Sequence, residues 1–191
     1  MSVNARIRSD LFVTGGFATG DIHANNCDVI PDTPQRRFCD THTSYLTQAK
    51  MSGSYTLPWQ QIQIGAVMQN LPGQQITAQW AAVSADAAAT LPRGFSGGGS
   101  RTVELIEPGT QYTPRRTQLD LRLAKSVKMG AKRFQFMADI YNLTNSNASV
   151  GATSNAGEPP AAIITTYGPA WLNPRNILQA RYIKFGAQLT F

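Results

Sequence analysis

Two cysteines and two histidines near the start of the chain form its most compact set of reactive side chains. Cys27 and Cys39 flank a proline-rich stretch, and His23 and His42 bracket the two cysteines. Outside the cytoplasm an even cysteine count favours a disulfide, which would stabilise so short a loop by about 3 kcal/mol through chain entropy. Two free thiols and a zinc site with the histidines are the alternatives, although the wide spacing differs from the compact cysteine pairs of structural zinc motifs.

A second candidate set consists of four charged residues, Asp120, Arg122, Asp139 and Lys184. Each falls on the polar side of a segment in which apolar and polar residues alternate. Acid–base catalysis would need a nucleophile or a third partner at a recognisable spacing, and the sequence offers neither. We therefore predict that these side chains face a wet interior, where they pair across strands or face a plug, with no catalytic step, no metal and no cofactor.

The long polar segments offer less chemistry. The glycine-rich stretch 94–99 has no lysine–serine end that would make it a phosphate loop. Residues 144–176 carry Tyr167, Trp171 and Arg175, which could contact a ligand such as a glycan because binding residues concentrate on loops. The basic residues are scattered despite a formal net charge of +6, so nucleic acid is not an expected partner.

The segment 177–191 indicates what kind of element positions these groups. Every second residue, counted back from the end, is apolar: Phe191, Leu189, Ala187, Phe185 and Ile183. A strict period of two indicates a β-strand with one apolar face and one wet face. Outer-membrane barrel strands show this pattern and end on an aromatic residue, because lipid covers one face and water or a plug the other.

The composition is consistent with that class of protein. Charged residues make up 15% of the 191 residues, below the roughly 25% usual in soluble domains. No apolar run approaches the ~18 residues of a transmembrane helix, and a membrane protein without such helices is a β-barrel. A secreted β-sandwich for carbohydrate binding or adhesion is the alternative. The first residues lack the apolar core of a signal peptide, so we expect the chain to be the tail of a longer one.

Alternation predicts about seven strands whose connections are alternately short and long. The predicted strands are 3–7, 11–19, 42–57, 61–69, 117–127, 133–143 and 177–191, and the fourth could continue into 75–80. Short turns fall near Ser9, Trp59 and Gly130, and long loops near 22–40, 81–116 and 144–176, with 85–89 as loop rather than helical turn. Outer-membrane barrels have short periplasmic turns and long external loops. The predicted fold is therefore all-β: an antiparallel up-and-down transmembrane β-barrel, present as a C-terminal fragment.

Several motifs carry a resemblance to a known family. The segments TQLDLRLAK at 117–125, DIYNLTN at 139–145 and the terminal KFGAQLTF resemble the C-terminal end of TonB-dependent outer-membrane receptors. The segments GSYTLPW at 53–59 and LPG at 71–73 are similar to the Oar-like branch, whose N-terminal region has a carboxypeptidase-regulatory-like domain.

The resemblance implies a plugged barrel of about 22 strands in the outer membrane of a Gram-negative-type bacterium. Such a receptor imports a scarce ligand (a siderophore, an oligosaccharide or a peptide-like molecule) with energy from the TonB complex. Residues 1–191 would supply about the last third of the barrel, without plug or TonB box. The expected partners are membrane lipid, the rest of the receptor and, through the plug, the TonB complex. Ile183, Phe185, Leu189 and Phe191 would form the signal read by the barrel assembly machinery.

The resemblance has a consequence for the isolated chain. Seven strands would leave two open edges, and each unpaired backbone group in lipid costs several kcal/mol. We therefore expect that the chain alone does not insert as a functional monomer.

Overall fold

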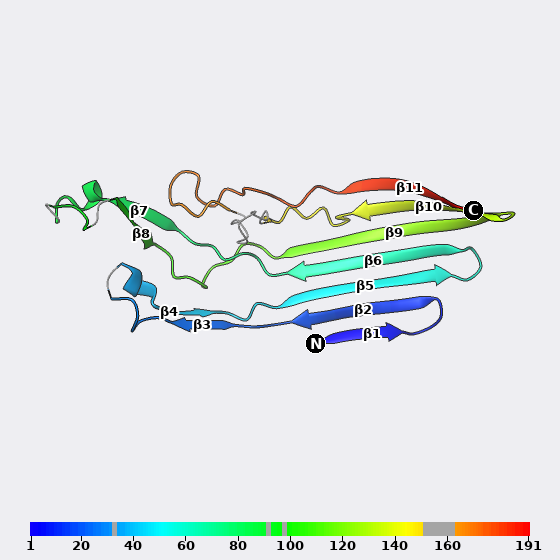
Figure 1. Cartoon of the computed structure of the whole chain (residues 1–191), viewed down its shortest axis with the longest axis horizontal. Helices are drawn as coiled ribbons and strands as arrows, with labels where there is room; N and C mark the ends of the chain where they lie inside the picture. The colour runs from blue at the N-terminus through cyan, green and yellow to red at the C-terminus, as the bar shows by residue number, and fades with distance from the viewer. Residues whose placement is uncertain (32–33, 91–92, 97–98, 151–162) are drawn as a thin grey trace.

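The computed structural model describes residues 1–31, 34–90, 93–96, 99–150 and 163–191. Its main element is one antiparallel sheet of seven strands, and two small hairpins extend beyond one end of that sheet (Figure 1). Parts of all three predicted loops, at 32–33, 91–92, 97–98 and 151–162, lie outside the described residues. None of the described helical segments combines the length and the apolar character that crossing a membrane requires.

The seven strands follow chain order across the sheet. They are β1 (Ser2–Arg6), β2 (Leu11–Ala18), β5 (Gln48–Leu57), β6 (Ile62–Leu71), β9 (Arg116–Met129), β10 (Lys132–Tyr141) and β11 (Tyr182–Thr190). The hairpins are β3 (Ile22–Asn25) with β4 (Asp40–Thr43) and β7 (Gln79–Val83) with β8 (Ser100–Glu104), and two 3₁₀ turns are η1 (Gln35–Phe38) and η2 (Ser84–Ala87). All neighbouring strands of the large sheet pair antiparallel. The all-β prediction is thus confirmed.

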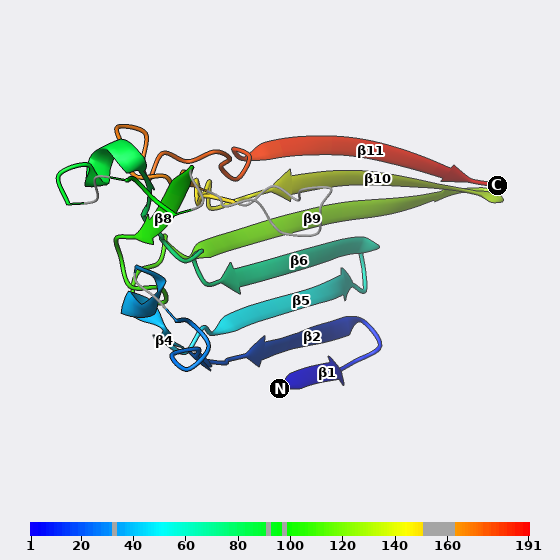
Figure 2. The ribbon, with the colours of Figure 1, turned by 60° about the vertical axis from the view of Figure 1, so that its left-hand side comes forward.

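The connections alternate in length, and the two kinds lie at opposite ends of the sheet. The short turns β1–β2, β5–β6 and β9–β10 lie at one end, and the long connections after β2, β6 and β10 lie at the other (Figure 1). We call these the turn end and the loop end. The sheet is not closed into a barrel, because β1 and β11 each have a partner on one side only (Figure 2).

The strand registers divide the sheet into two chemically different faces. Residues paired across strands share a face, so the pairs Met51–Met68, Ile64–Leu123 and Phe134–Leu189 lie on one face. This apolar face carries, strand by strand, Val3, Leu11, Val13, Met51, Tyr55, Ile62, Ile64, Met68, Leu121, Leu123, Phe134, Phe136, Ile140, Ile183, Phe185 and Leu189, with Lys125 as its one internal charge. The opposite, polar face carries mainly Ser, Thr, Gln, Asn and charged side chains.

The apolar face is exposed rather than packed into a core. Phe185 is 78% exposed, Phe136 53% and Leu123 50%, and no second sheet covers them within the described ranges. No large side chain among the described residues is fully buried. Few apolar residues are buried: Ala124 in β9, and Ala78, Ala82, Ala148 and Ile163 in the long connections at the loop end.

Several predicted boundaries are wrong in instructive ways. The predicted strand 42–57 is two strands, because the chain leaves β4 at Thr43 and enters the large sheet only at Gln48. The continuation of 61–69 into 75–80 is wrong, because β6 ends at Leu71 and β7 pairs with β8 in a separate sheet. The loops near 22–40 and 81–116 contain strands of the two small hairpins. Residues 84–87 form a 3₁₀ turn that overlaps 85–89, which had been predicted as loop rather than helical turn. The predicted strands 133–143 and 177–191 are shorter, with ends at Tyr141 and a start at Tyr182.

Candidate functional site

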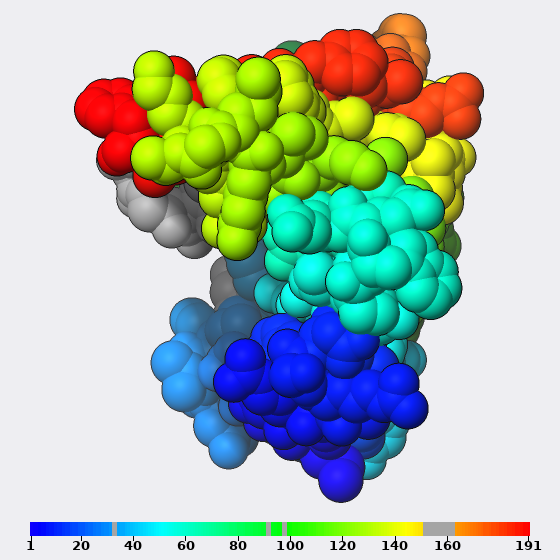
Figure 3. Space-filling model, turned by 90° about the vertical axis from the view of Figure 1, so that its right-hand side faces the viewer, coloured from blue at the N-terminus to red at the C-terminus, as the bar shows by residue number. Residues whose placement is uncertain are grey.

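The polar face of the large sheet is the candidate functional site. Hollows of about 350, 420 and 360 Å³ open on this face, lined chiefly by the polar residues of the strands. Seen along the strands from the turn end, the molecule is hollowed between its first strands, in blue, and its last strands, in green and red (Figure 3). The polar, hollowed face can hold water or polar partners, whereas the exposed apolar face opposite cannot.

Arg122 and Asp139 form the central ion pair of this face. Arg122 Nε and Nη2 donate to the two carboxylate oxygens of Asp139 at 2.6 and 2.9 Å. The two residues are cross-strand partners on β9 and β10, and Lys184 on β11 is the partner of Asp139 on its other side. Asp120 lies on the same face and accepts hydrogen bonds from the Gln118 side chain. The structure therefore brings the four sequence-selected charges onto one face, with Arg122 and Asp139 in direct contact.

Two tyrosines extend this site toward the loop end. Tyr141 and Tyr182 are register partners, and their rings stack at 4.7 Å between centroids with a 16° interplanar angle. Tyr141 also lines the same hollow as Phe12 and Arg122. An apolar ring surface beside an ion pair suits a ligand or a protein surface of mixed polarity. The alternation pattern alone did not single out this stack, because the pairing of β10 with β11 crosses a long connection.

Asn142, directly after β10, is a buried hub that the sequence reasoning missed. It is 2% exposed, and its Nδ2 donates to the carbonyl oxygens of Ser146 at 2.8 Å and Gln179 at 2.7 Å. Its Oδ1 accepts from Ser146 N at 2.9 Å and Thr144 Oγ1 at 3.3 Å, and its own N–H donates to Asp120 Oδ1 at 2.8 Å. Its φ of 51° lies in the left-handed region, which asparagine tolerates better than most residues. One side chain thus fastens both ends of the 142–181 connection to the rim of the sheet.

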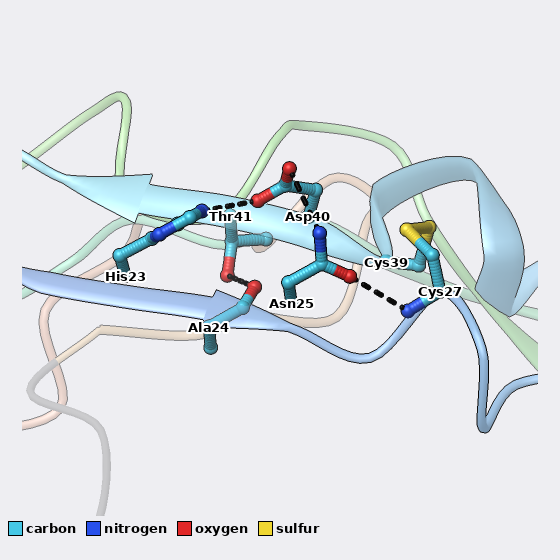
Figure 4. The surroundings of a disulfide bond; sticks show 7 residues. All are labelled: His23, Ala24, Asn25, Cys27, Cys39, Asp40 and Thr41. Carbon is cyan, nitrogen blue, oxygen red and sulfur yellow. Dashed lines mark hydrogen bonds and ion pairs between the residues drawn. A yellow bond between two sulfur atoms is a disulfide. The ribbon is translucent and has the colours of Figure 1, made fainter.

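The β3–β4 hairpin holds both cysteines and both histidines of the chain. Cys27 and Cys39 are joined by a disulfide at the tip of this hairpin, and no cysteine is free (Figure 4). His23 Nε2 lies 2.6 Å from Asp40 Oδ1, and Asn25 Nδ2 donates to the same carboxylate at 3.2 Å. The disulfide and this side-chain network hold the hairpin together outside the large sheet.

The zinc alternative is not supported by the geometry of this hairpin. His23 and His42 are direct cross-strand partners with ring centroids 6.0 Å apart, but their Nε2 atoms face different carboxylates, Asp40 and Asp21. Each histidine is therefore paired with a different carboxylate, and the four side chains do not share one point. Across the described residues no three His, Cys, Asp or Glu side chains are placed to hold a metal ion.

The disulfide makes a direct prediction about proteolysis. Arg36 and Arg37 lie within the loop that Cys27 and Cys39 close, and both are exposed. Trypsin cleavage after either arginine should leave two pieces joined in non-reducing electrophoresis and separated after reduction. In Cys39→Ser the pieces should separate without reductant, and cleavage should be faster because the loop loses about 3 kcal/mol of chain-entropy stabilisation. Titration of two reactive thiols in the unreduced protein would contradict the assignment.

The aromatic residues predicted to contact a ligand belong to an interlocked set of connections at the loop end. Trp171 Nε1 donates to the Thr77 carbonyl at 3.0 Å, and the rings of Trp171 and Tyr167 lie 6.0 Å apart. Gln79 at the start of β7 exchanges backbone hydrogen bonds with Thr165 and Tyr167. Trp171 therefore has a packing role between two connections, whereas Tyr167, 57% exposed, offers a free ring surface. Arg175 is exposed.

The residues proposed as an assembly signal lie on the face opposite the ion pair. Ile183 is 55% exposed, Phe185 78%, Leu189 45% and Phe191 94%. Ile183, Phe185 and Leu189 therefore form an apolar strip along the outer strand β11, and Phe191 follows the last residue of that strand. Lys184, between two of them, lies on the polar face beside Asp139.

The polar face carries groups that can bind and align polar partners. Its central charges, Arg122 and Asp139, are paired with each other. The hollow around Arg122 and Asp139 is also lined by the carboxylate of Asp120 and by hydroxyls, glycines and apolar groups. Comparison of the chain with models of protein families, with curated proteins and with solved structures gives no match.

Proposed function

We propose that this chain forms part of the wall of a transmembrane β-barrel, in an outer-membrane receptor of the TonB-dependent type that transports a scarce ligand. The observation that carries the proposal is the continuous apolar face of seven strands, exposed on every strand and opposite a polar, hollowed face. In water such a face would be an aggregation surface of unusual size, whereas hydrocarbon solvates it at no cost. The polar face would then line the lumen.

The strand directions support a wall that further strands complete. Six successive antiparallel pairings separate β1 from β11, so the two edge strands run in the same direction. A barrel closed only through antiparallel pairs must therefore add an odd number of strands between these edges. A second copy of this sheet, also of seven strands, meets this condition only when it is inverted, with its loop end beside the turn end of the first copy. Two copies inserted in the same orientation would meet edge to edge through parallel contacts. The partner that fits is the remaining, differently built part of the same receptor.

The arrangement of connections and aromatics also supports the proposal. Short turns lie at one end and long connections at the other, as expected for a periplasmic and an external end. Trp59 and Phe191 lie at the turn end and are 77% and 94% exposed, where a barrel carries its aromatic girdle. The interlocked connections of the loop end, including Tyr167, would meet the ligand first.

The proposal is tested by asking what each face touches in the cell. After alkaline washing, the chain should remain with outer membranes, and a lipid-dissolved photoreactive probe should label Phe185, Leu189 and Phe136 far more than Lys184 and Gln188. Recovery of the chain in the soluble fraction, or equal labelling of alternate residues, would instead indicate a secreted β-sandwich or another soluble sheet protein. The transport part has its own measurement. A solute whose depletion from the medium slows when the gene is deleted should also be depleted more slowly when the TonB complex is lost. If the two losses affected different solutes, the transport proposal would be contradicted.

A further inference from the structure

Two basic side chains face each other at the turn end of the polar face without a neutralising partner. Lys128 on β9 and Arg133 on β10 are direct cross-strand partners. Like charges directly opposite each other destabilise a pair of strands. Within the part of the chain that the structure describes, neither has a carboxylate within ion-pair distance.

The acidic residues on these two strands are too far away to compensate. Asp120 lies eight residues before Lys128 and Asp139 six residues after Arg133, which corresponds to roughly 26 and 20 Å along a strand. Asp139 is in addition occupied by Arg122. The sheet therefore places two positive charges together where an external anion would relieve their repulsion.

The surroundings of the pair have the form of a binding site. Lys128 and Arg133 line a hollow of about 420 Å³ together with neutral hydrogen-bonding side chains, which are Thr56, Gln61, Gln63, Ser126 and Gln135. Ser126 is 8% exposed, and its Oγ accepts a hydrogen bond from Arg133 Nη2 at 3.1 Å. This bond holds the guanidinium in one orientation and leaves its other N–H groups available. Hydroxyl and amide groups, with Leu57 and Pro58, line the rest of the hollow, and no carboxylate among the described residues does.

The chemistry of this lining selects an oxyanion. A guanidinium presents paired N–H donors that match two oxygens of a phosphate or carboxylate, and an ammonium adds a mobile point charge. A metal cation would be repelled by the same two groups. At Arg122 the fold itself supplies an anion, the carboxylate of Asp139. At Lys128 and Arg133 the described part of the fold supplies none.

We infer that the hollow around Lys128, Arg133 and Ser126 is a binding site for a phosphate group. The phosphate could belong to a soluble solute or to a lipid headgroup, which share this chemistry. If the proposed function holds, the site lies at the periplasmic end of the lumen and takes a soluble phosphate. The phosphate site itself does not depend on the proposed function, because it is inferred only from the strand register and the residues that line the hollow.

The experiment measures how fast individual lysines of the native protein, extracted from its cells in detergent and freed of lipid, react with an amine-acylating reagent. Lys125 is the internal control, because it lies three residues from Lys128 on the opposite face. At saturating inorganic phosphate, compared with chloride of equal ionic strength, acylation of Lys128 should slow by about fivefold or more, because the bound fraction is protected. Acylation of Lys125 should not change. Equal rates at Lys128 in phosphate and chloride, with no protection in the vesicle arm below, would overturn the inference.

Two variants and a second arm make the result specific. Arg133→Gln should abolish the protection of Lys128, whereas Lys125→Gln, with the same loss of charge on the other face, should retain it. Undiminished protection of Lys128 in Arg133→Gln would contradict the site. Arg133→Lys keeps the charge, so phosphate should still protect Lys128 partially in this variant. It serves as the test if the glutamine variant folds poorly. Phosphatidylglycerol vesicles without free phosphate form the second arm. Protection by inorganic phosphate supports a soluble solute, and protection by vesicles alone supports a headgroup and counts against an enclosed lumen. Membrane fractionation decides the proposed function separately.

Discussion

Replacing Asn142 by alanine is expected to lower the free energy of unfolding by about 3 kcal/mol or more. The substitution removes the amide that holds Ser146 and Gln179, and buried backbone groups left without partners cost about 1–3 kcal/mol each. Alanine at a φ of 51° adds about 1 kcal/mol of backbone strain. Urea unfolding followed by tryptophan fluorescence measures the loss.

Two further variants separate the hub from the general effect of a substitution in this segment. Asn142→Asp keeps the acceptor oxygens and tolerates a positive φ but loses the Nδ2 donor, so it should fall between wild type and Asn142→Ala. Asn147→Ala changes an exposed residue five positions later and should cost less than about 0.5 kcal/mol. A value for Asn142→Ala as small as that of Asn147→Ala would show that the hub contributes nothing.

The hub also bears on the register of the last strand. β11 reaches β10 only after the long 142–181 connection, and a slip of one residue would move Phe185 and Leu189 to the polar face. Asn142 links the two ends of this connection next to the Tyr141–Tyr182 pair, so it favours the observed register. A disulfide between Met137→Cys and Gly186→Cys, which are register partners, should therefore form less completely in the Asn142→Ala background.

The faces of the sheet could be predicted from the sequence because alternation is a local property. The residues of 177–191 show it without reference to any other strand, and the observed registers align its apolar positions with those of β10. Hairpins that leave the sheet gave no such signal. In the segment 42–57 the alternation of side chains continues through residues 44–47, which belong to neither β4 nor β5. One strand was therefore predicted where two exist.

The contacts of the candidate site were less accessible to sequence reasoning because they depend on register. Asp139 and Arg122 could be assigned to a wet face by periodicity, but their direct pairing requires the alignment of β9 with β10. The opposition of Lys128 and Arg133 has the same origin, although their short separation around the turn at Gly130 was a signal that could have been used. Asn142 was hidden for another reason, since its partners lie up to 37 residues away in the chain.

Replacing Gly73 by alanine is expected to disrupt the base of the second long connection. A Cβ atom at this position would lie 1.6 Å from the carbonyl oxygen of Thr113, and the obstacle is backbone, which cannot move aside as a side chain can. Thr113 is 7% exposed and exchanges hydrogen bonds with Gln74, through Gln74 N to Thr113 Oγ1 and Thr113 N to Gln74 O, both at 2.8 Å. The bonds that align 73–76 with 111–113 must therefore lengthen or break. We expect a local loss of about 3 kcal/mol or more.

Hydrogen exchange measures this effect where it arises. In Gly73→Ala the amides of Gln74, Ile76 and Thr113 should exchange at least about a hundredfold faster, since each 1.4 kcal/mol of local stability is about a factor of ten in the opening equilibrium. Gly20→Ala is the matched control, because no atom lies within 4 Å of a Cβ added there, and it should leave these amides unchanged. The strands β9 and β10 should keep their protection in both variants, because their ladder does not pass through Gly73. Unchanged exchange at Thr113 in Gly73→Ala would mean that residues 73–76 and 111–113 are not in contact. The interlocked arrangement of the loop end would then be wrong.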